Sequence, residues 1–444
     1  MTAADPAVRI ERAGRTPDLL ALADTLPGPA SLYTVRGWTV VLGEPLDTLH
    51  ELAALSDAAD RIGWRDARDP ALPPFTGGLA GYLTDELSRG LLALPPRPAR
   101  PAPAPLPALA FGVHDTALCA DPDGTLWLVA ADLPGWSRRP PGERIDALRR
   151  LVADAPAPPA GTAPPPTTAA ASLDRAAHAA AVAQAREWIA AGDLYQLNLT
   201  LQVRAAWTGG GAALARRLWD ASPGAAHAAW LRAGAGVEIV SASPETFLRT
   251  DAGQVAVRPI KGTAARSGDA RDDAAAADAL RHSPKDAAEH VMIVDLERND
   301  LGRVAVHGSV RVPEFAALEG HPTVWHLTST VTAALRPDVT LGNLLAATFP
   351  CGSVTGAPKR MAVDRIDDLE PTARGVYCGA IGVVSRGLVD LSVAIRTAVV
   401  HDGVAHYGTG GGIVADSRPD DEWQEVLHKA EAFFAAANTR LPQP

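Results

Sequence analysis

Two pairs of acidic residues have the spacing that places both carboxylates of a pair on one face of a helix. Asp286 and Glu289 lie three residues apart, and so do Glu422 and Glu425. Carboxylates from two such helices could hold a hard divalent cation by oxygen, in the manner of Mg²⁺ rather than Zn²⁺. For each helix alone, a solvated acidic face is the simpler interpretation, with Lys429 as the i,i+4 partner of Glu425.

A carboxyl group and a primary amine could together support proton transfer or nucleophilic catalysis. Glu245 follows a proline-stiffened turn in SASPETFL, and Lys261 comes 16 residues later in VRPIKGTAAR. We interpret the second stretch as a short strand that runs into a turn, with the lysine at its corner. If the two residues flank a hairpin, they can meet as acid and nucleophile. Either residue alone would more often be a solvated surface charge.

Two glycine-rich segments could bind an anion through backbone N–H groups. We interpret GTGGGIVADS as a loop of this kind, although a tight strand connection is the simpler interpretation. It is not a dinucleotide fingerprint, because Ile413 stands where the sixth position needs Gly. The second segment, FPCGSVTGAPKR, departs from the Walker pattern because two residues separate Gly356 from Lys359. An ATPase is therefore not expected.

One stretch divides the chain into two regions. Residues 153–171 are rich in Pro, Ala and Thr and are predicted to be a linker or long surface loop. An N-terminal region, 1–152, precedes it, and a catalytic region, 172–440, follows. Helices are expected at LDRAAHAAAVAQAREWIAAGD, SPKDAAEHVMIVDLERNDLG, VDRIDDLEP and PDDEWQEVLHKAEAFFAAANTRL, with strands between them. The mixture lacks a regular βαβ alternation, which predicts an α+β fold with antiparallel sheets.

Composition argues against two classes of partner. The formal net charge of the 444 residues is −10, and an acidic protein repels phosphate backbones, so nucleic acid is not expected. No apolar run reaches the length of a membrane span, and no signal region precedes the domain, so we expect a cytoplasmic protein without membrane contact. The three cysteines have no metal-like spacing and do not suggest a disulfide framework.

Taken together, the motifs resemble the chorismate-utilising enzymes. That family includes anthranilate synthase component I, aminodeoxychorismate synthase component I, isochorismate synthase and salicylate synthase. The resemblance covers residues 173–440 and rests on blocks in the family order: GDLYQLNLT, ASPETFL, RPIKGTAAR, AEHVMIVDLERNDLGRV, FPCGSVTGAPK, YCGAIG, IRT and GGGIVADSRPDDEWQEVLHKA. It implies two antiparallel sheets packed face to face with helices outside, Mg²⁺ as cofactor and chorismate as substrate.

The resemblance also implies roles for individual residues. Glu289 and Glu425 match direct metal ligands, while Asp286 and Glu422 match partners that reach the metal through water. Asp286 stands where the family usually has Glu. The residues expected to contact the substrate are Thr263, Gln196, Tyr377, Arg396, Gly410, Gly411, Gly412 and Lys429. The residues expected to be catalytic are Lys261, Glu245 and His326.

Two positions distinguish between members of the family. Anthranilate synthases resemble this chain but have Ala where Lys261 stands, whereas aminodeoxychorismate synthases have the lysine. Isochorismate and salicylate synthases place a lysine where this chain has Gln196, and glutamine cannot be the base that activates water. The resemblance therefore favours an aminodeoxychorismate synthase, which makes 4-amino-4-deoxychorismate for p-aminobenzoate and folate or for a secondary metabolite.

Ammonia for such a reaction needs a source. The chain lacks the G-x-C-x-G motif of a glutaminase nucleophile, so the resemblance implies a separate glutamine amidotransferase subunit. The first alternative is an anthranilate synthase component I, which would release pyruvate. Others are an isochorismate or salicylate synthase, which would need no ammonia, and a non-catalytic binding protein. The retained acidic residues, Lys261 and Glu245 argue against the last of these.

Overall fold

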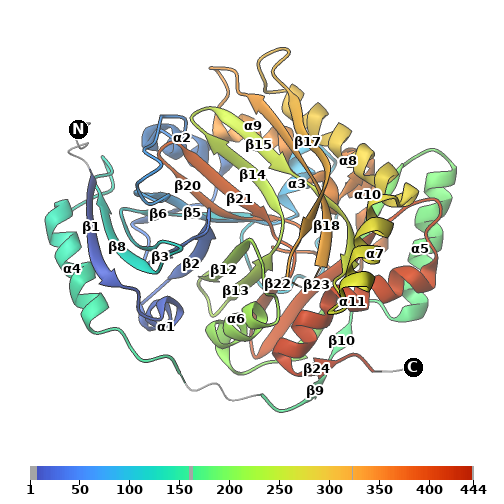
Figure 1. Cartoon of the computed structure of the whole chain (residues 1–444), viewed down its shortest axis with the longest axis horizontal. Coiled ribbons are helices and arrows are strands. Elements are labelled where there is room, and N and C mark those ends of the chain that lie inside the picture. The colour runs from blue at the N-terminus through green and yellow to red at the C-terminus, as the bar shows by residue number, and fades with distance from the viewer. Residues whose placement is uncertain (1–7, 160–163, 323, 443–444) are drawn as a thin grey trace.

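Two large antiparallel sheets organise the chain in the computed structural model, which describes residues 8–159, 164–322 and 324–442 (Figure 1). The 12-stranded first sheet has the order β1 (Val8–Arg15), β8 (Thr125–Ala131), β7 (Thr116–Ala120), β3 (Trp38–Leu42), β2 (Ser31–Val35), β12 (His227–Arg232), β13 (Glu238–Ser243), β22 (Thr397–His401), β23 (Val404–Ile413), β11 (Gln196–Ala206) and β10 (Ala170–Ala171), with β19 (Gly356–Ala357) paired to β11.

The 10-stranded second sheet carries the strand that contains Lys261. Its order is β16 (Ile260–Ala265), β18 (Val324–Ala334), β15 (Gln254–Arg258), β14 (Thr246–Asp251), β21 (Leu388–Val393), β20 (Ala380–Ser385), β5 (Gly78–Leu83), β6 (Leu109–His114) and β4 (Asp47–Leu49), with β17 (Arg311–Gly320) paired to β18. A small parallel pair joins β24 (Thr439–Arg440) to β9 (Thr167–Thr168).

Helices surround the two sheets. They are α1 (Leu19–Thr25), α2 (Leu52–Ile62), α3 (Leu87–Leu91), α4 (Pro141–Ala153), α5 (Arg175–Ala190), α6 (Gly210–Asp220), α7 (Ala270–Arg281), α8 (Pro284–Gly302), α9 (Leu341–Thr348), α10 (Lys359–Leu369) and α11 (Pro419–Ala437), with a 3₁₀ turn η1 (Gly352–Val354). The four helices expected after the linker are confirmed as α5, α8, α10 and α11. No helix in the described ranges is long and apolar enough to cross a membrane.

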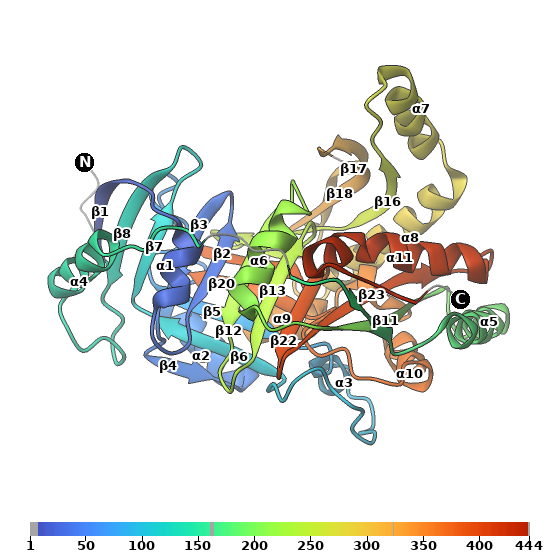
Figure 2. The same ribbon diagram turned by 90° about the horizontal axis from the view of Figure 1, so that it is seen from below.

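The two large sheets pack face to face, as predicted. Val40 and Ile239 of the first sheet meet Tyr82 and Val383 of the second in one buried cluster. The outer face of the first sheet packs against α1, α6 and α11, which lie on the same side of it in Figure 2. The α+β fold class is therefore confirmed, with the helices outside the paired sheets.

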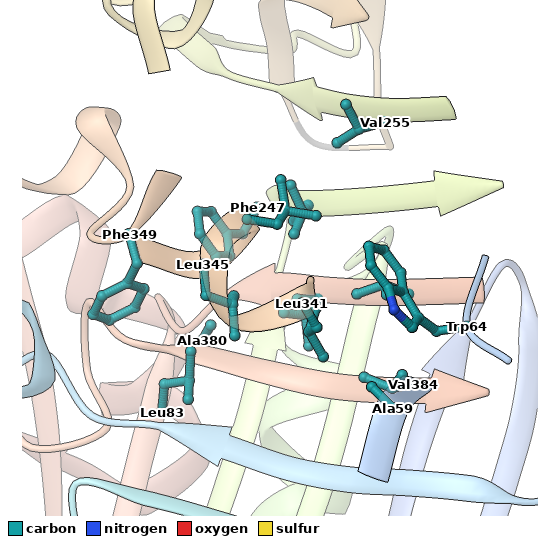
Figure 3. Close-up of a cluster of buried hydrophobic side chains, with 14 of the residues drawn as sticks. Ala59, Trp64, Leu83, Phe247, Val255, Leu341, Leu345, Phe349, Ala380 and Val384 are labelled. Carbon is teal, nitrogen blue, oxygen red and sulfur yellow. The ribbon is translucent and has the colours of Figure 1, made fainter. Parts of the chain in front are cut away.

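The outer face of the second sheet has its own apolar layer, beneath α2, α8 and α9. Figure 3 shows part of it, where side chains from the sheet and from the segments that cover it interdigitate. Among the residues it labels are Trp64, Phe247, Leu341, Leu345 and Phe349. Burial of these side chains holds α9 and the turn that follows it against the sheet.

Strands of the N-terminal region extend both sheets. Tyr33 in β2 pairs with Ala229 in β12, and Gly81 in β5 pairs with Gly382 in β20. Residues 153–171 therefore separate two regions along the sequence, but each of the two large sheets contains strands from both regions. Within that stretch the structure has short strands β9 and β10, and residues 160–163 lie outside the described ranges.

The helices that carry the acidic pairs have clear local signals. Ser283 caps α8 by accepting a hydrogen bond from the Asp286 backbone N–H at 3.2 Å, and Pro284 occupies the first turn. The first turn of α11 contains Glu422 with two aspartates, which complements the positive end of the helix dipole. It ends at Asn438, whose φ of 48° is left-handed.

Candidate active site

Lys261 lies inside a strand rather than at the corner of a turn, so that part of the sequence interpretation is wrong. In β16 it pairs with Leu327 of β18, and a bulge follows between Lys261 and Thr263. Gly262 has a φ of 77° in this bulge, which explains the turn-like Lys-Gly-Thr signal. A Cβ at Gly262 would lie 2.9 Å from Leu280 Cδ1 and 3.2 Å from Asp286 Oδ1. The glycine therefore lets α7 and α8 approach the strand closely.

The amine of Lys261 is enclosed by groups from several elements. Its Nζ donates a hydrogen bond to the backbone oxygen of Ser353 at 3.2 Å. Burial lowers the pKa of Lys261 below its ordinary value; Glu289 opposes this shift, while the ammonium of Lys429 adds to it. A lower pKa makes the neutral, nucleophilic amine more accessible near neutrality.

Glu245 lies in the connection between β13 and β14 and is almost fully buried. Its backbone is fixed on both sides, because its N–H donates to Ser243 Oγ at 3.2 Å and its carbonyl accepts from the Val393 N–H at 3.0 Å. Burial raises the pKa of this carboxyl, while the Ser353 hydroxyl and Lys261 oppose the rise. Its Oε1 has no hydrogen-bond partner among the described residues.

Glu245, from the β13–β14 connection, and Lys261, from β16, thus approach the same residue, Ser353. Lys261 donates to the Ser353 carbonyl, and the Ser353 hydroxyl acts to lower the pKa of Glu245. The two side chains make no direct ion pair in the described part of the structure. A carboxyl whose pKa is raised and an amine whose pKa is lowered therefore share one site.

The acidic face of α11 lies over the glycine strand β23. A Cβ placed on Gly411 would be 3.2 Å from both Glu422 Oε2 and Glu425 Oε1. Glu422 is 3% exposed, so it is not the solvated surface charge of the simpler interpretation. The expected i,i+4 contact is present, with Lys429 Nζ 2.6 Å from Glu425 Oε1.

The donor chemistry of this region fits a hard divalent cation. Glu422 and Glu425 from α11 lie beside Gly411, while on α8 Asp286 lies beside Gly262 and Glu289 acts on Lys261. All four groups are carboxylates, whose oxygens are the ligands that Mg²⁺ takes in proteins. Among the described residues, no group of three acidic, His or Cys side chains is already gathered closely enough to hold a metal. The Mg²⁺ site remains a prediction.

Gly410, Gly411 and Gly412 belong to strand β23, so their interpretation as a loop is wrong. They pair with Thr200, Leu199 and Asn198 of β11. On the other side of β23, the ladder with β22 ends at Tyr407. Beyond Tyr407, the edge of β23 that faces away from β11 is therefore not paired with β22 in the described ranges, and the backbone of the glycines is turned toward the site. There the Gly410 carbonyl accepts a hydrogen bond from Lys429 Nζ at 3.0 Å. The absence of side chains lets α11 and polar groups approach the backbone.

Gln196 begins β11 beside this strand and is fully buried. Neither its Oε1 nor its Nε2 has a hydrogen-bond partner within the described ranges. A Cβ at Gly412 would lie 2.1 Å from Nε2, so the amide packs directly on the glycine backbone. A buried amide with both polar atoms unpaired is costly, which suits a side chain that binds a polar ligand.

His326 and Thr263 face each other across β16 and β18. Thr263 Oγ1 lies 3.0 Å from His326 Nδ1. Burial lowers the pKa of His326 to about 4, and the nearby His321 and Arg396 add to this. His326 is therefore neutral at physiological pH and suited to hydrogen bonding.

Arg396 and Tyr377 complete the set of predicted residues. Arg396 has a left-handed φ of 50° where the chain leaves β21, and its carbonyl accepts from the Ala242 N–H at 3.1 Å. The Tyr377 ring packs on β23, because a Cβ at Gly408 would lie 2.1 Å from its Cγ. Arg396 acts to lower the pKa of His326, and Tyr377 packs on the glycine strand, while their roles toward substrate stay predictions.

The structure also reveals buried charged residues that the sequence analysis did not assign to the site. Lys359 forms an ion pair with Asp300 and donates to the Thr348 carbonyl at 2.7 Å. Glu297 lies one turn before Asp300 and accepts from the Gly352 N–H at 3.2 Å. The pair Glu297 and Asp300 has the same three-residue spacing as the other acidic pairs on α8 and α11, which is the signal that could have found it.

Comparison with known proteins identifies the family of this chain. A model of the chorismate binding enzyme matches residues 33–435. The chain belongs to the chorismate-binding enzymes. The family resemblance expected from the motifs is thereby confirmed, and the match includes the N-terminal strands from β3 onward.

Two kinds of chorismate-binding enzyme are equally similar to the chain in sequence. It is 38% identical over 408 residues to aminodeoxychorismate synthase component 1 of Salmonella typhimurium, covering 91% of this chain and 85% of that protein. It has the same identity and coverage with anthranilate synthase component 1 of Thermus thermophilus. Among solved structures, anthranilate synthase component I from Streptococcus pneumoniae superposes with a TM-score of 0.75 at 27% identity, covering 97% of this chain and 93% of that one. These similarities establish a chorismate-utilising enzyme and leave its reaction to the chemistry of the site.

Proposed function

We propose that the chain is an aminodeoxychorismate synthase component I, which converts chorismate and ammonia to 4-amino-4-deoxychorismate. The observation that carries this proposal is the pairing of Lys261 with Glu245 around Ser353. Burial favours the neutral amine of the one and the protonated carboxyl of the other. A nucleophile and an acid in one site suit the replacement of a ring hydroxyl better than the attack of water.

In the proposed reaction Glu245 donates its proton to the C4 hydroxyl, which leaves as water, while the neutral amine of Lys261 attacks C2. The ring double bonds shift, and the proton lost from the alkylated amine returns to Glu245. Ammonia then attacks C4, the double bonds shift back, and Lys261 leaves C2 with a proton taken from the attacking nitrogen. The sum is chorismate plus ammonia giving aminodeoxychorismate plus water, with pyruvate retained on the ring.

Other residues of the site bind and orient the dianionic substrate in this proposal. Arg396 and Lys429 supply positive charge, and the edge of β23 offers backbone groups. Gln196 contributes an amide whose two polar atoms are free to pair with substrate. A glutamine there cannot deprotonate water, which disfavours an isochorismate product.

We further propose Mg²⁺ as the cofactor. Glu289 and Glu425 would hold it directly, with Asp286 and Glu422 acting through water. When bound, the ion supplies positive charge for a substrate carboxylate. Without the ion, Glu289 and Glu425 place negative charge near Lys261.

Ammonia would come from a separate glutamine amidotransferase subunit. Both relatives named above are called component 1, which supports a partner subunit. Free ammonium at alkaline pH would substitute for that partner in vitro.

The product of the isolated chain tests the proposed function. Purified protein with chorismate, Mg²⁺ and ammonium is expected to form a product in which an amino group replaces a hydroxyl, with no release of pyruvate. Mass spectrometry of the product and a coupled lactate dehydrogenase assay for pyruvate measure both. Anthranilate together with stoichiometric pyruvate would instead identify an anthranilate synthase, and isochorismate formed without ammonium would exclude amination.

Removal of divalent cations is expected to abolish turnover. EDTA followed by gel filtration should reduce chorismate consumption by about 10²-fold or more, because a substrate carboxylate would then lose its counter-charge beside four carboxylates. Added Mg²⁺ should restore the rate in proportion to occupancy. Glu425→Gln should show weaker Mg²⁺ activation, and Glu431→Gln on the exposed side of α11 is the matched control. Full activity of protein shown by elemental analysis to be metal-free would exclude the Mg²⁺ site.

A further inference from the structure

A second buried carboxyl lies behind the turn that Lys261 and Glu245 approach. Glu297 of α8 is 1% exposed, and its Oε1 accepts from the Gly352 N–H at 3.2 Å. A Cβ at Gly352 would lie 3.1 Å from that oxygen and 2.5 Å from Leu296 Cδ2, so α8 packs directly on the turn. Glu297 Oε2 is buried without a hydrogen-bond partner among the described residues. The mechanism proposed above does not use this carboxyl.

Glu297 is joined to Glu245 by a continuous chain of polar side chains. The Cys351 thiol lies 3.9 Å from Glu297 Oε1, and its sulfur is 3.3 Å from Ser353 Oγ. The Ser353 hydroxyl in turn lies beside the Glu245 carboxyl and acts to lower its pKa. All four side chains are 6% exposed or less, so bulk water does not screen the connection.

We propose that Glu297 is a positioning residue for Glu245, which acts through Cys351 and Ser353 to keep the acid proton on Glu245. The inference rests on the proposed function, in which Glu245 is the general acid. It assigns to α8 a second contribution to the site, separate from its predicted metal ligands.

The physical basis is that the Cys351 thiol and the Ser353 hydroxyl each carry a single hydrogen to donate. When Glu297 is ionised, the Cys351 thiol donates to it, and the sulfur is then an acceptor for the Ser353 hydroxyl. That hydroxyl is drawn away from Glu245, whose anion loses a donor. The negative charge of Glu297 also repels a second negative charge nearby. Both effects favour protonated Glu245.

The charged groups around Glu297 and Glu245 do not cancel the effect of Glu297 on the protonation of Glu245. Lys359 faces Glu297 but is engaged in its ion pair with Asp300, which itself faces Glu297. Burial raises the pKa of Glu297, as it does that of Glu245. Glu245 is faced by Lys261 and by Lys429, which is bonded to Glu425 and Gly410. Glu297 itself forms no ion pair within the described ranges.

The test compares Glu297→Gln with the wild type across pH. The amide keeps an acceptor for the Gly352 N–H and removes the ionisable group. The measured quantity is the ratio of kcat/KM for chorismate consumption, variant to wild type, from pH 6 to pH 9.5 at constant free ammonia. The ratio is expected to be near one at the acid end and to fall with rising pH, about tenfold for each unit by which the pKa of Glu245 drops.

Two further variants distinguish the effect of the Glu297 charge from the effect of its side-chain shape. Glu297→Asp keeps an ionisable group and should show a pH-independent ratio, even if its overall rate is lower. Cys351→Ala interrupts the chain and should show a fall in the same direction as Glu297→Gln. The matched control is Glu238→Gln in β13, another carboxylate that accepts from a glycine N–H, that of Gly211 at 2.7 Å. Its ratio should stay flat.

A flat ratio for folded Glu297→Gln, with thermal melting unchanged, would overturn the inference and leave Glu297 with a packing role. A flat ratio for Cys351→Ala alone would overturn the connection through the thiol. The readout is chorismate consumption, so it does not depend on which product forms. If Glu245→Gln kept full activity, the acid role in the proposed function would fail, whatever Glu297→Gln did.

Discussion

Lys261→Ala is expected to abolish turnover of chorismate, lowering kcat/KM by about 10⁴- to 10⁶-fold, the range seen when an enzyme loses its nucleophile. The reason is that the partly buried amine, with its lowered pKa, has no substitute at its position in β16. Stopped-flow and steady-state assays of chorismate loss, with mass analysis of the protein during turnover, measure the rate and the covalent adduct. An adduct should form on the wild type and be absent from the variant.

Lys261→Arg is the control that separates attack from positioning. Arginine keeps the positive charge and a long side chain, but it does not deprotonate in a protein. If Lys261 is the nucleophile, the arginine variant should be as inactive as the alanine variant. Substantial turnover by Lys261→Arg, or by Lys261→Ala, would show that the residue serves only to place charge, and the covalent mechanism would be wrong.

Glu245→Gln is expected to reduce kcat by about 10²- to 10⁴-fold, the usual contribution of a general acid. Glutamine retains the size of the side chain and can still bond to Ser353, so chorismate binding should persist. Isothermal titration with chorismate and rate measurements across pH check the two quantities separately. The wild-type rate should fall at the alkaline end, because Glu245 must be protonated to act.

The same substitution is expected to stabilise the fold at alkaline pH. Burial holds the pKa of Glu245 in the folded state above its value in the unfolded state. Ionisation of Glu245 therefore costs more free energy in the folded state, and the stability of the protein falls as pH rises through the folded pKa. Glutamine cannot ionise, so the Tm of Glu245→Gln should exceed that of the wild type at pH 8 and match it near pH 4. An unchanged kcat would exclude the acid role, while a lower Tm at pH 8 would show that the carboxylate is stabilised by its surroundings.

Local signals predicted much of the architecture. The serine cap and proline before α8, and the acidic first turn of α11, belong to each helix itself, so the sequence alone located both helices. The presence of strands between these helices was also predictable. The pairing of both sheets across the linker was not, because partners such as Gly81 and Gly382 are separated by most of the chain.

Predictions at glycine positions were wrong most often, because a glycine in the sequence can indicate either a turn or a backbone that another element approaches closely. Gly410 to Gly412 suggested a loop, yet they lie in a strand whose partner in β11 begins more than 200 residues earlier. Their lack of side chains is explained by α11, whose carboxylates would meet a Cβ there. Gly262 suggested a turn, yet it is a bulge that lets Asp286 approach.

What the sequence by itself determined is the inventory of chemistry: an amine at Lys261, a carboxyl at Glu245, two helical acidic pairs and the motifs that mark a chorismate-binding enzyme. The tertiary structure decided which of these groups share an environment. Burial around Ser353 shifts the pKa of Lys261 and that of Glu245 in opposite directions, and packing of α8 on the Gly352 turn adds Glu297 behind them. The physical reason is that desolvation and charge–charge interaction depend on distance in space, which residue type and spacing along the chain do not specify.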